Sequence, residues 1–221
     1  MRNVFAAALL LSASIALGDD QITHAFSASA SRGGASRVVI DVPAGDVKIR
    51  SGAASAIRIT GFVRRNYDGN NERNKQQRIA NDITVGIDVH GDEAVISRKY
   101  GPSANSWSAR SWHSTYDMSV EVPRGVDLDI RTKYGDVTLD GDFGNVDVDL
   151  TAGEIHLTVP RSSVRELNAS VRVGEVHTDT GDLHEDHEGL FPGRTRFYNA
   201  TGRSTINVHT TFGEVHVTLT K

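Results

Sequence analysis

The chain carries, from residue 38 to residue 49, the stretch Val38-Val39-Ile40-Asp41-Val42-Pro43-Ala44-Gly45-Asp46-Val47-Lys48-Ile49. Its pattern is a run of alternating apolar residues, then a glycine, an acid and a second alternating run. The same glycine-acid-apolar core returns at Gly135-Asp136-Val137, Gly153-Glu154-Ile155, Gly174-Glu175-Val176 and Gly213-Glu214-Val215. Internal repeats are typical of architectures built from stacked units, so this repeat is the main evidence for the fold.

Alternation on both sides of the glycine predicts two strands, each with one buried face. The apolar positions lie seven and five residues before the glycine, and two and four residues after it. On one straight strand these two sets would point in opposite directions, because side chains alternate between the faces. We therefore expect a bend at the glycine that reverses the alternation, since glycine adopts positive φ without steric cost. The predicted core residues are Val38, Ile40, Val47, Ile49, Leu128, Ile130, Val137, Leu139, Val146, Val148, Ile155, Leu157, Leu167, Ala169, Val176, Thr178, Ile206, Val208, Val215 and Val217.

The spacing of the repeats favours stacking over a simple hairpin arrangement. From Gly135 onward, successive repeat glycines are 18, 21 and 39 residues apart, and the last interval is close to two units. Units of about twenty residues cannot bury a hydrophobic face alone and have to stack on their neighbours. The predicted fold is therefore all-β, a short β-solenoid (β-helix-like) of strand-bend-strand units. A twisted β-sandwich is the alternative.

Three segments are distinguished along the chain. Residues 1–18 are predicted as a signal peptide, because Arg2 precedes an apolar run at 4–11 that is followed by small residues. Residues 19–36 are rich in Ser, Ala and Gly and are predicted as a linker, with a strand at 22–26 as an alternative. Residues 37–221 are predicted to form a single β-solenoid-like domain.

Irregular stretches interrupt the repeats. Residues 66–81 are polar and predict either one surface helix over 72–80 or a loop. Residues 83–97 predict a hairpin. Residues 100–116 hold both tryptophans, and residues 181–202 again lack the alternation. Excursions from a rigid scaffold are the places where binding residues are common.

Composition excludes several functional classes. The chain has no cysteine, which excludes thiol catalysis, disulfides and cysteine-bound zinc. Its formal charge of −4 comes from well-mixed acids and bases, which argues against nucleic acid and against attraction to anionic lipid. After the predicted signal, no apolar stretch is long enough to span a membrane. We therefore expect an exported protein, periplasmic or extracellular, at the cell envelope.

The repeat resembles the bacterial putative-adhesin family, a group of secreted all-β proteins without an assigned function. The resemblance covers residues 37–221. It implies adhesion at a cell surface and brings no catalytic residues with it. The stretches that carry it are Ile40-Asp41-Val42-Pro43-Ala44-Gly45-Asp46-Val47, Val120-Glu121-Val122-Pro123 and Tyr134-Gly135-Asp136-Val137-Thr138-Leu139-Asp140-Gly141, with the later Gly-Glu turns.

The aromatic concentration in residues 100–116 is the candidate ligand site. Exposed aromatic rings stack on sugars and arginine adds hydrogen bonds, so Trp107, Arg110, Trp112 and Tyr116 are candidate glycan-binding residues. A structural interpretation competes with this one. Trp112 and Tyr116 continue the alternation of the strand that follows, which would place both side chains in the core.

Several polar clusters in the sequence contain residue types that can bind metal ions. His184 and His187 flank two acids, and histidines three apart on a helix can share a metal ion, but the paired-histidine zinc motif is absent. The acids after the repeat glycines, and His156, His177 and His216 two residues beyond them, are predicted on one outward face. The favoured interpretation of each is an ordinary solvated surface, so no cofactor is predicted.

The sequence carries no nucleophile elbow, phosphate loop or dinucleotide fingerprint. The predicted function is that of an exported non-enzymatic β-scaffold, an adhesin or an envelope-associated binding or structural protein. The alternative is a carbohydrate-binding or carbohydrate-active protein that uses residues 100–116. Expected partners are a cell-surface or glycan ligand and a second copy of the chain, paired through the C-terminal strand edge at 205–221.

Overall fold

The computed structural model describes residues 21–66, 70–104, 114–179, 184–187 and 193–221, so the predicted signal peptide lies outside the described residues. The elements are β1 Gln21–Ser31, β2 Arg37–Asp41, β3 Val47–Gly52, β4 Ala56–Asn66, α1 Asn70–Asn81, β5 Ile83–His90, β6 Glu93–Tyr100, the 3-10 turn η1 Pro102–Ala104, β7 Ser114–Pro123, β8 Asp127–Tyr134, β9 Val137–Asp140, β10 Val146–Pro160, β11 Val164–Thr178, β12 His184–His187, β13 Gly193–Tyr198 and β14 Ser204–Thr220. In the described part of the chain, all fourteen strands belong to one sheet.

Each repeat folds as a strand, a bend at the glycine and a second strand, as predicted. In β10 the strand runs through the bend at Gly153, and Val148 and Ile155 on either side of it are both buried. The five repeat glycines all have positive φ, between 114° and 141°. All the predicted core residues except Thr178 are buried. The reversal of alternation at the glycine is therefore confirmed.

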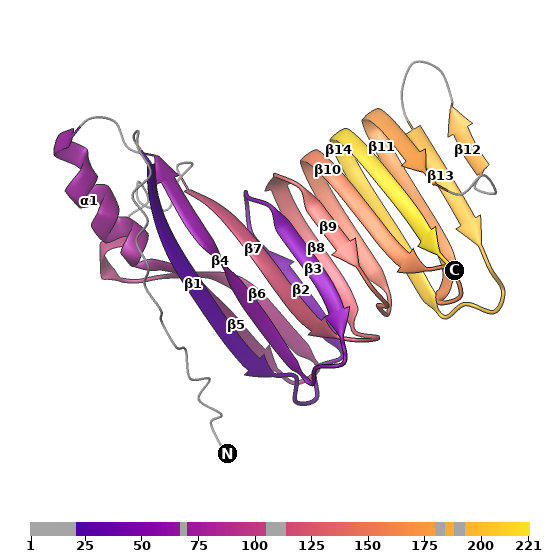
Figure 1. Ribbon diagram of the computed structural model, residues 1–221, viewed down its shortest axis with the longest axis horizontal. Coiled ribbons are helices and arrows are strands. Elements are labelled where there is room, and N and C mark those ends of the chain that lie inside the picture. Colours follow the sequence, from indigo (N-terminus) through magenta and orange to yellow (C-terminus); the bar gives the residue numbers. More distant parts are fainter. Residues whose placement is uncertain (1–20, 67–69, 105–113, 180–183, 188–192) are drawn as a thin grey trace.

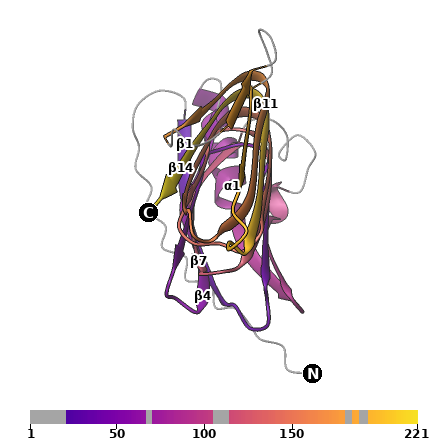
Figure 2. The same ribbon diagram turned by 90° about the vertical axis from the view of Figure 1, so that its right-hand side faces the viewer.

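The repeats stack in parallel into an elongated β-solenoid with two facing layers (Figures 1 and 2). One layer contains β2 and β8, whose register continues into the first half of β10. The other contains β3 and β9, whose register continues into the second half of β10. Valine, isoleucine and leucine side chains from both layers fill the interior between them. The solenoid prediction is confirmed.

The order of the rungs does not follow the order of the chain. Strand β14 lies between β10 and β11 and pairs in parallel with both, from Val146↔Ile206 on one side and from Leu167↔Ile206 on the other. The two earlier strands are joined directly through the turn at 161–163, which spans the rung that β14 fills. The prediction of self-association through the C-terminal strand edge is wrong, because both edges of β14 are occupied within the same chain.

At the N-terminal end the stack changes from parallel to antiparallel pairing. Residues 21–31 form β1, which pairs with β4 along its whole length. This agrees with the alternative of a strand at 22–26, and the strand continues to residue 31, into the stretch predicted as a linker. Ile22, Phe26 and Ala30 lie on one face of this strand and are buried. The predicted hairpin is β5 and β6, which pair from Ile83↔Tyr100 to His90↔Glu93.

The polar stretch after β4 is a helix, which decides between the two predictions for residues 72–80. Helix α1 packs against β1, β4 and β5 and buries Ile79 and Ala80, its apolar pair (Figure 1). The helix thereby covers one end of the hydrophobic interior. Within the described ranges, no helix is long and apolar enough to cross a membrane.

The bend glycines are expected to be intolerant of any side chain. Gly213 has φ 135°, and a Cβ there would lie 2.0 Å from the carbonyl oxygen of Gly153 on the neighbouring rung. Because the contact is with backbone, Gly213→Ala is expected to lower the free energy of unfolding by about 3 kcal/mol or more. The control is Gly52→Ala, where a Cβ would meet nothing within 4 Å. Urea unfolding should place that variant within about 0.5 kcal/mol of the wild type, and equal losses would contradict the stacking argument.

Candidate functional site

The acids that follow the repeat glycines form one column along the stack, here called the acid ladder. In rung order it contains Asp117, Asp46, Asp136, Glu154, Glu214 and Glu175. Asp117 belongs to this column although no glycine precedes it, because β7 pairs in register with β3. Residues far apart in the chain thus repeat at the spacing of neighbouring strands, about 4.8 Å.

The aspartates of the acid ladder accept hydrogen bonds from the backbone of the next rung. The Oδ1 atom of Asp117 accepts from the N–H of Asp46 at 3.1 Å, and Oδ1 of Asp46 accepts from the N–H of Asp136 at 3.1 Å. Oδ1 of Asp136 in turn accepts from the N–H of Glu154 at 2.9 Å. These carboxylates therefore satisfy backbone donors at the bend, where the regular ladder of backbone hydrogen bonds is disturbed.

The three glutamates of the acid ladder make a different contact, because their side chains are one carbon longer. Each glutamate belongs to a Gly-Glu-Ile-His or Gly-Glu-Val-His sequence and reaches the histidine two residues later. The distance from Nε2 to Oε2 is 3.0 Å for His156 and Glu154, and 3.1 Å for His216 and Glu214. Nε2 of His177 lies 3.5 Å from Oε2 of Glu214 and 3.6 Å from Oε2 of Glu175.

The three histidines stack on one another. The ring centroids of His156 and His216 are 4.7 Å apart with an interplanar angle of 11°, and those of His177 and His216 are 4.9 Å apart at 23°. His216 occupies the middle because β14 lies between β10 and β11. Spacing along the sequence does not determine whether these histidines are neighbours, and the structure brings all three together with Glu154 and Glu214. We call this group the His-Glu cluster.

The cluster contains two sets of ligand atoms suited to a metal ion. The ligand atoms of Glu154, His156 and His216 lie within 4.8 Å of one another, as do those of His177, Glu214 and His216. The side chains of both sets are 36–47% exposed, so an ion has access from solvent. Imidazole nitrogen with carboxylate oxygen is a ligand set for zinc and related transition metals.

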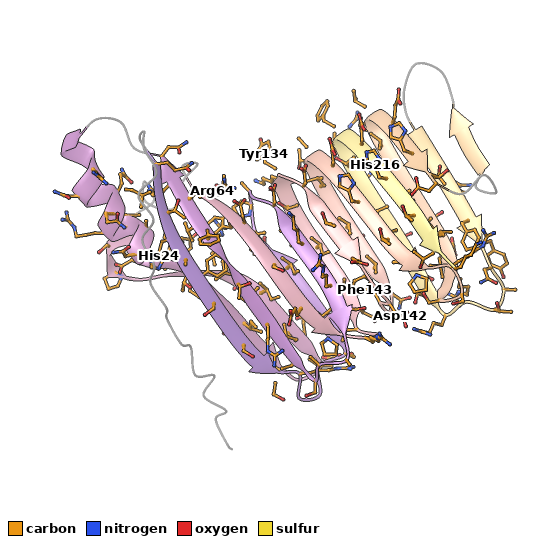
Figure 3. All side chains as sticks on the ribbon, in the orientation of Figure 1. His24, Arg64, Tyr134, Asp142, Phe143 and His216 are labelled. Atoms are coloured by element: carbon orange, nitrogen blue, oxygen red, sulfur yellow. The ribbon has the colours of Figure 1, made fainter. Side chains whose placement is uncertain are left out.

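A column of apolar side chains, three of them exposed, lies immediately before the glycines. Tyr134, Ala152, Phe212 and Val173 occupy equivalent positions on consecutive rungs, and we call this column the apolar ridge. Tyr134 is 50% exposed, Phe212 52% and Val173 39%. In Figure 3, Tyr134 lies along the same edge of the stack as His216, and Asp142 lies near the opposite edge. The acid ladder and the apolar ridge thus run side by side at the bends.

Of the predicted site residues, the structure describes the backbone of Tyr116, His184 and His187. Trp107, Arg110 and Trp112 lie outside the described residues. Tyr116 is 1% exposed and belongs to the core, as the competing structural interpretation predicted. His184 and His187 lie in strand β12, which pairs with β13, so the helical spacing considered for a metal site does not apply.

The buried Tyr116 has an unusual environment for its hydroxyl group. Burial, followed by the neighbouring Tyr100, raises the pKa of Tyr116 to about 12. The guanidinium of Arg98 opposes the shift and lies over the ring, 6.0 Å from its centroid. Tyr116 occupies the place of a bend glycine on the rung next to Gly45, and its backbone N–H donates to the carbonyl of Ala44 at 2.9 Å.

The apolar ridge was not predicted from the sequence, although the residue before each repeat glycine indicates it. The residue before each repeat glycine varies between alanine, valine and aromatic residues, and the predicted core pattern assigned no role to it. A bend reverses the alternation across this position, so an apolar residue there is exposed instead of buried. Aromatic residues directly before a repeat glycine, here Tyr134 and Phe212, are therefore the sequence signal of this exposed column.

Tyr116 is expected to make the stability of the protein depend on alkaline pH. The folded state holds the Tyr116 proton more tightly than the unfolded state, where the pKa is about 10. The resulting stabilisation of about 2–3 kcal/mol is fully present below pH 10 and is lost as the pH rises to about 12. Urea unfolding across this range should show a smaller loss for Tyr116→Phe than for the wild type. The exposed Tyr198→Phe should behave as the wild type, and identical pH profiles for all three proteins would contradict the shift.

The acid ladder is expected to stabilise the bends through its acceptors. Asp136→Ala removes the acceptor of the Glu154 N–H and should lower the free energy of unfolding by about 1–3 kcal/mol. Asp136→Asn keeps an oxygen acceptor and should lose less than half as much. Asp147→Ala, an exposed acid on β10, serves as the control and should change stability by about 0.5 kcal/mol at most. Equal effects of Asp136→Ala and Asp136→Asn would show that charge, and not hydrogen bonding, matters here.

The chain is similar to several solved structures and to one protein family. Among solved structures, the chain is similar to a putative cell adhesion protein from Clostridium sporogenes ATCC 15579, with 12% identity and a TM-score of 0.44 over 90% of this chain and 100% of that one. It is also similar to putative adhesins from Parabacteroides distasonis ATCC 8503 (9% identity, TM-score 0.25, 86% and 96% of the two chains) and Parabacteroides merdae ATCC 43184 (8%, 0.23, 86% and 95%). No curated protein sequence matches the chain. The family model described as Toastrack DUF4097 matches residues 27–218, which confirms the family resemblance stated from the repeat. The chain therefore belongs to the Toastrack DUF4097 family.

Proposed function

We propose that this protein is an exported, non-enzymatic β-scaffold that binds a ligand at the cell envelope through the apolar ridge. The observation that carries the proposal is the exposure of Tyr134, Phe212 and Val173 in one column along the stack. Contiguous apolar groups on a surface are unfavourable in water, and such patches commonly mark binding sites. Burying a side chain of this size under a ligand contributes about 1.5–3 kcal/mol.

The surroundings of the apolar ridge support a role in binding. The acid ladder runs beside it, so an apolar centre is bordered by a polar rim, which is the usual arrangement of an interface. Backbone pairing on both sides of β14 holds Phe212 in a fixed register between Ala152 and Val173. A ligand would meet a surface that needs little ordering on binding, which favours affinity.

The proposal of a non-enzymatic role is supported by how the aspartates are used. Carboxylates that act as general acids or bases have to be available to a substrate. In the acid ladder, Asp117, Asp46 and Asp136 accept backbone hydrogen bonds from the adjacent rung. Their positions are thus explained by the stacking of the rungs. Export is supported by the leader pattern at residues 1–18.

A carbohydrate ligand is the second candidate, and the exposed rings favour it. Tyr134 and Phe212 lie on β8 and β14 with one rung between them, and aromatic faces in such positions can stack on sugar rings. The carboxylates of the acid ladder follow two residues after each ring and can accept hydrogen bonds from sugar hydroxyls. For a carbohydrate ligand we therefore propose a contact surface at the bends, since the buried Tyr116 is not accessible to a ligand.

The ridge can be tested with a double variant and a matched control. We expect the double variant Tyr134→Ala and Phe212→Ala to weaken ligand binding at least about tenfold, because the ligand would lose its contacts with two aromatic rings that it covers in the wild type. Tyr198→Ala removes an aromatic side chain that is 72% exposed on β13, away from the ridge, and should bind as the wild type. The labelled proteins are compared on a glycan array and on purified cell-envelope fractions.

The two assays separate the candidates. Array binding that the double variant loses supports the carbohydrate ligand, and loss on envelope fractions alone supports another envelope component. Binding that all three proteins share would show that the ridge is not the contact surface. Fractionation of cells producing the full chain tests export, and a cytosolic location would contradict that part of the proposal.

A further inference from the structure

We propose that the His-Glu cluster binds a single divalent transition-metal ion, with Zn²⁺ as the probe of choice. The cluster is formed by His156, His216 and His177 with Glu154 and Glu214. The proposal is independent of the apolar ridge, because it rests on different side chains and on a different ligand. It assigns a specific chemistry to the three C-terminal repeats.

The geometry of the cluster is close to that of a bound ion. Tetrahedral zinc ligands lie about 2.0–2.1 Å from the metal, which puts them about 3.3 Å from one another. The Nε2 and Oε2 atoms of the two closest His-Glu pairs are already 3.0 and 3.1 Å apart. The remaining ligand atom of each set lies within 4.8 Å, so rotation of partly exposed side chains suffices to complete the set. Little reorganisation of the backbone is required.

The cluster is confined to the rungs that carry it, which argues against a general role in stacking. On the rung next to His156 the equivalent residue is Thr138, and on the following rungs it is Lys48 and then Ser119. These rungs stack in the same parallel register without any imidazole. The three histidine rungs also carry glutamate where the others carry aspartate, so both members of the pair change together.

The chemistry of the ligands selects the class of ion. Two imidazole nitrogens and one carboxylate oxygen suit Zn²⁺, Cu²⁺, Ni²⁺ or Co²⁺. Ca²⁺ and Mg²⁺ require six or more oxygen ligands or an octahedral oxygen set, which the cluster does not offer. Three protein ligands at a partly exposed position leave room for water at the remaining coordination position. The expected site is therefore open on its outer side.

His216, which both sets of ligand atoms share, limits the number of metal ions that one chain can bind. Its Nε2 lies 3.1 Å from Oε2 of Glu214, and we expect this nitrogen to bind the ion in either set. A ring nitrogen has one lone pair and cannot hold two ions at once. The sets Glu154-His156-His216 and His177-Glu214-His216 therefore exclude each other, and the expected ratio is one ion per chain. His216 is the ligand that either arrangement needs.

Isothermal titration calorimetry with Zn²⁺ on protein freed of any histidine tag tests the proposal. The wild type should bind one equivalent, and Ca²⁺ should give no binding. His216→Asn should weaken Zn²⁺ binding at least about tenfold, because loss of a ligand costs no less than loss of a supporting residue. The control is His209→Asn, on the same strand but hydrogen-bonded to Ser170 outside the cluster, which should bind as the wild type.

Two further variants keep the proposal falsifiable if His216→Asn does not fold by circular dichroism. His156→Asn and His177→Asn each remove one set and leave the other, so each single variant should retain one site. The double variant should lose at least about tenfold in affinity. Absence of saturable Zn²⁺ binding to the wild type would overturn the proposal. Equal weakening by His209→Asn, or two equivalents per chain with both bound at the cluster, would overturn it as well.

Discussion

The close approach of backbones at the bends is the constraint on which the rest of the structure depends. At Gly153, Gly174 and Gly213 a Cβ would lie 1.7–2.1 Å from a glycine carbonyl of the next rung. Such distances are possible only without a side chain, and the positive φ of these residues adds the same requirement. The glycines therefore let the rungs pack at the ordinary spacing of strands while the chain turns from one layer to the other.

The bend also explains why the surface is ordered into columns. Rungs in register place equivalent residues side by side, so the positions before and after the glycine become the apolar ridge and the acid ladder. Within the acid ladder, the length of the acidic side chain then determines which contact it makes. Aspartate reaches the backbone N–H of the neighbouring rung, as Asp136 does with Glu154, whereas glutamate reaches the histidine two residues later. One methylene group thus distinguishes a structural acid from a candidate metal ligand.

The insertion of β14 joins parts of the chain that the sequence keeps apart. The last strand occupies a rung that the turn at 161–163 leaves between β10 and β11. It supplies the middle histidine of the His-Glu cluster and the most exposed aromatic residue of the apolar ridge. Both candidate sites are therefore completed only when the end of the chain has been placed in the stack.

The sequence by itself determined the local structure, because alternation and glycine bends are properties of short segments. It predicted the strands, the reversal of alternation at Gly153 and a set of core residues of which all but Thr178 are buried, and it offered α1 as one of two alternatives. The tertiary structure decided which segments are neighbours, since strand pairing joins residues that are distant in the chain. It alone placed His216 between His156 and His177, paired β1 with β4, and exposed Phe212. Such contacts depend on the order of the rungs, which no periodicity within a segment encodes.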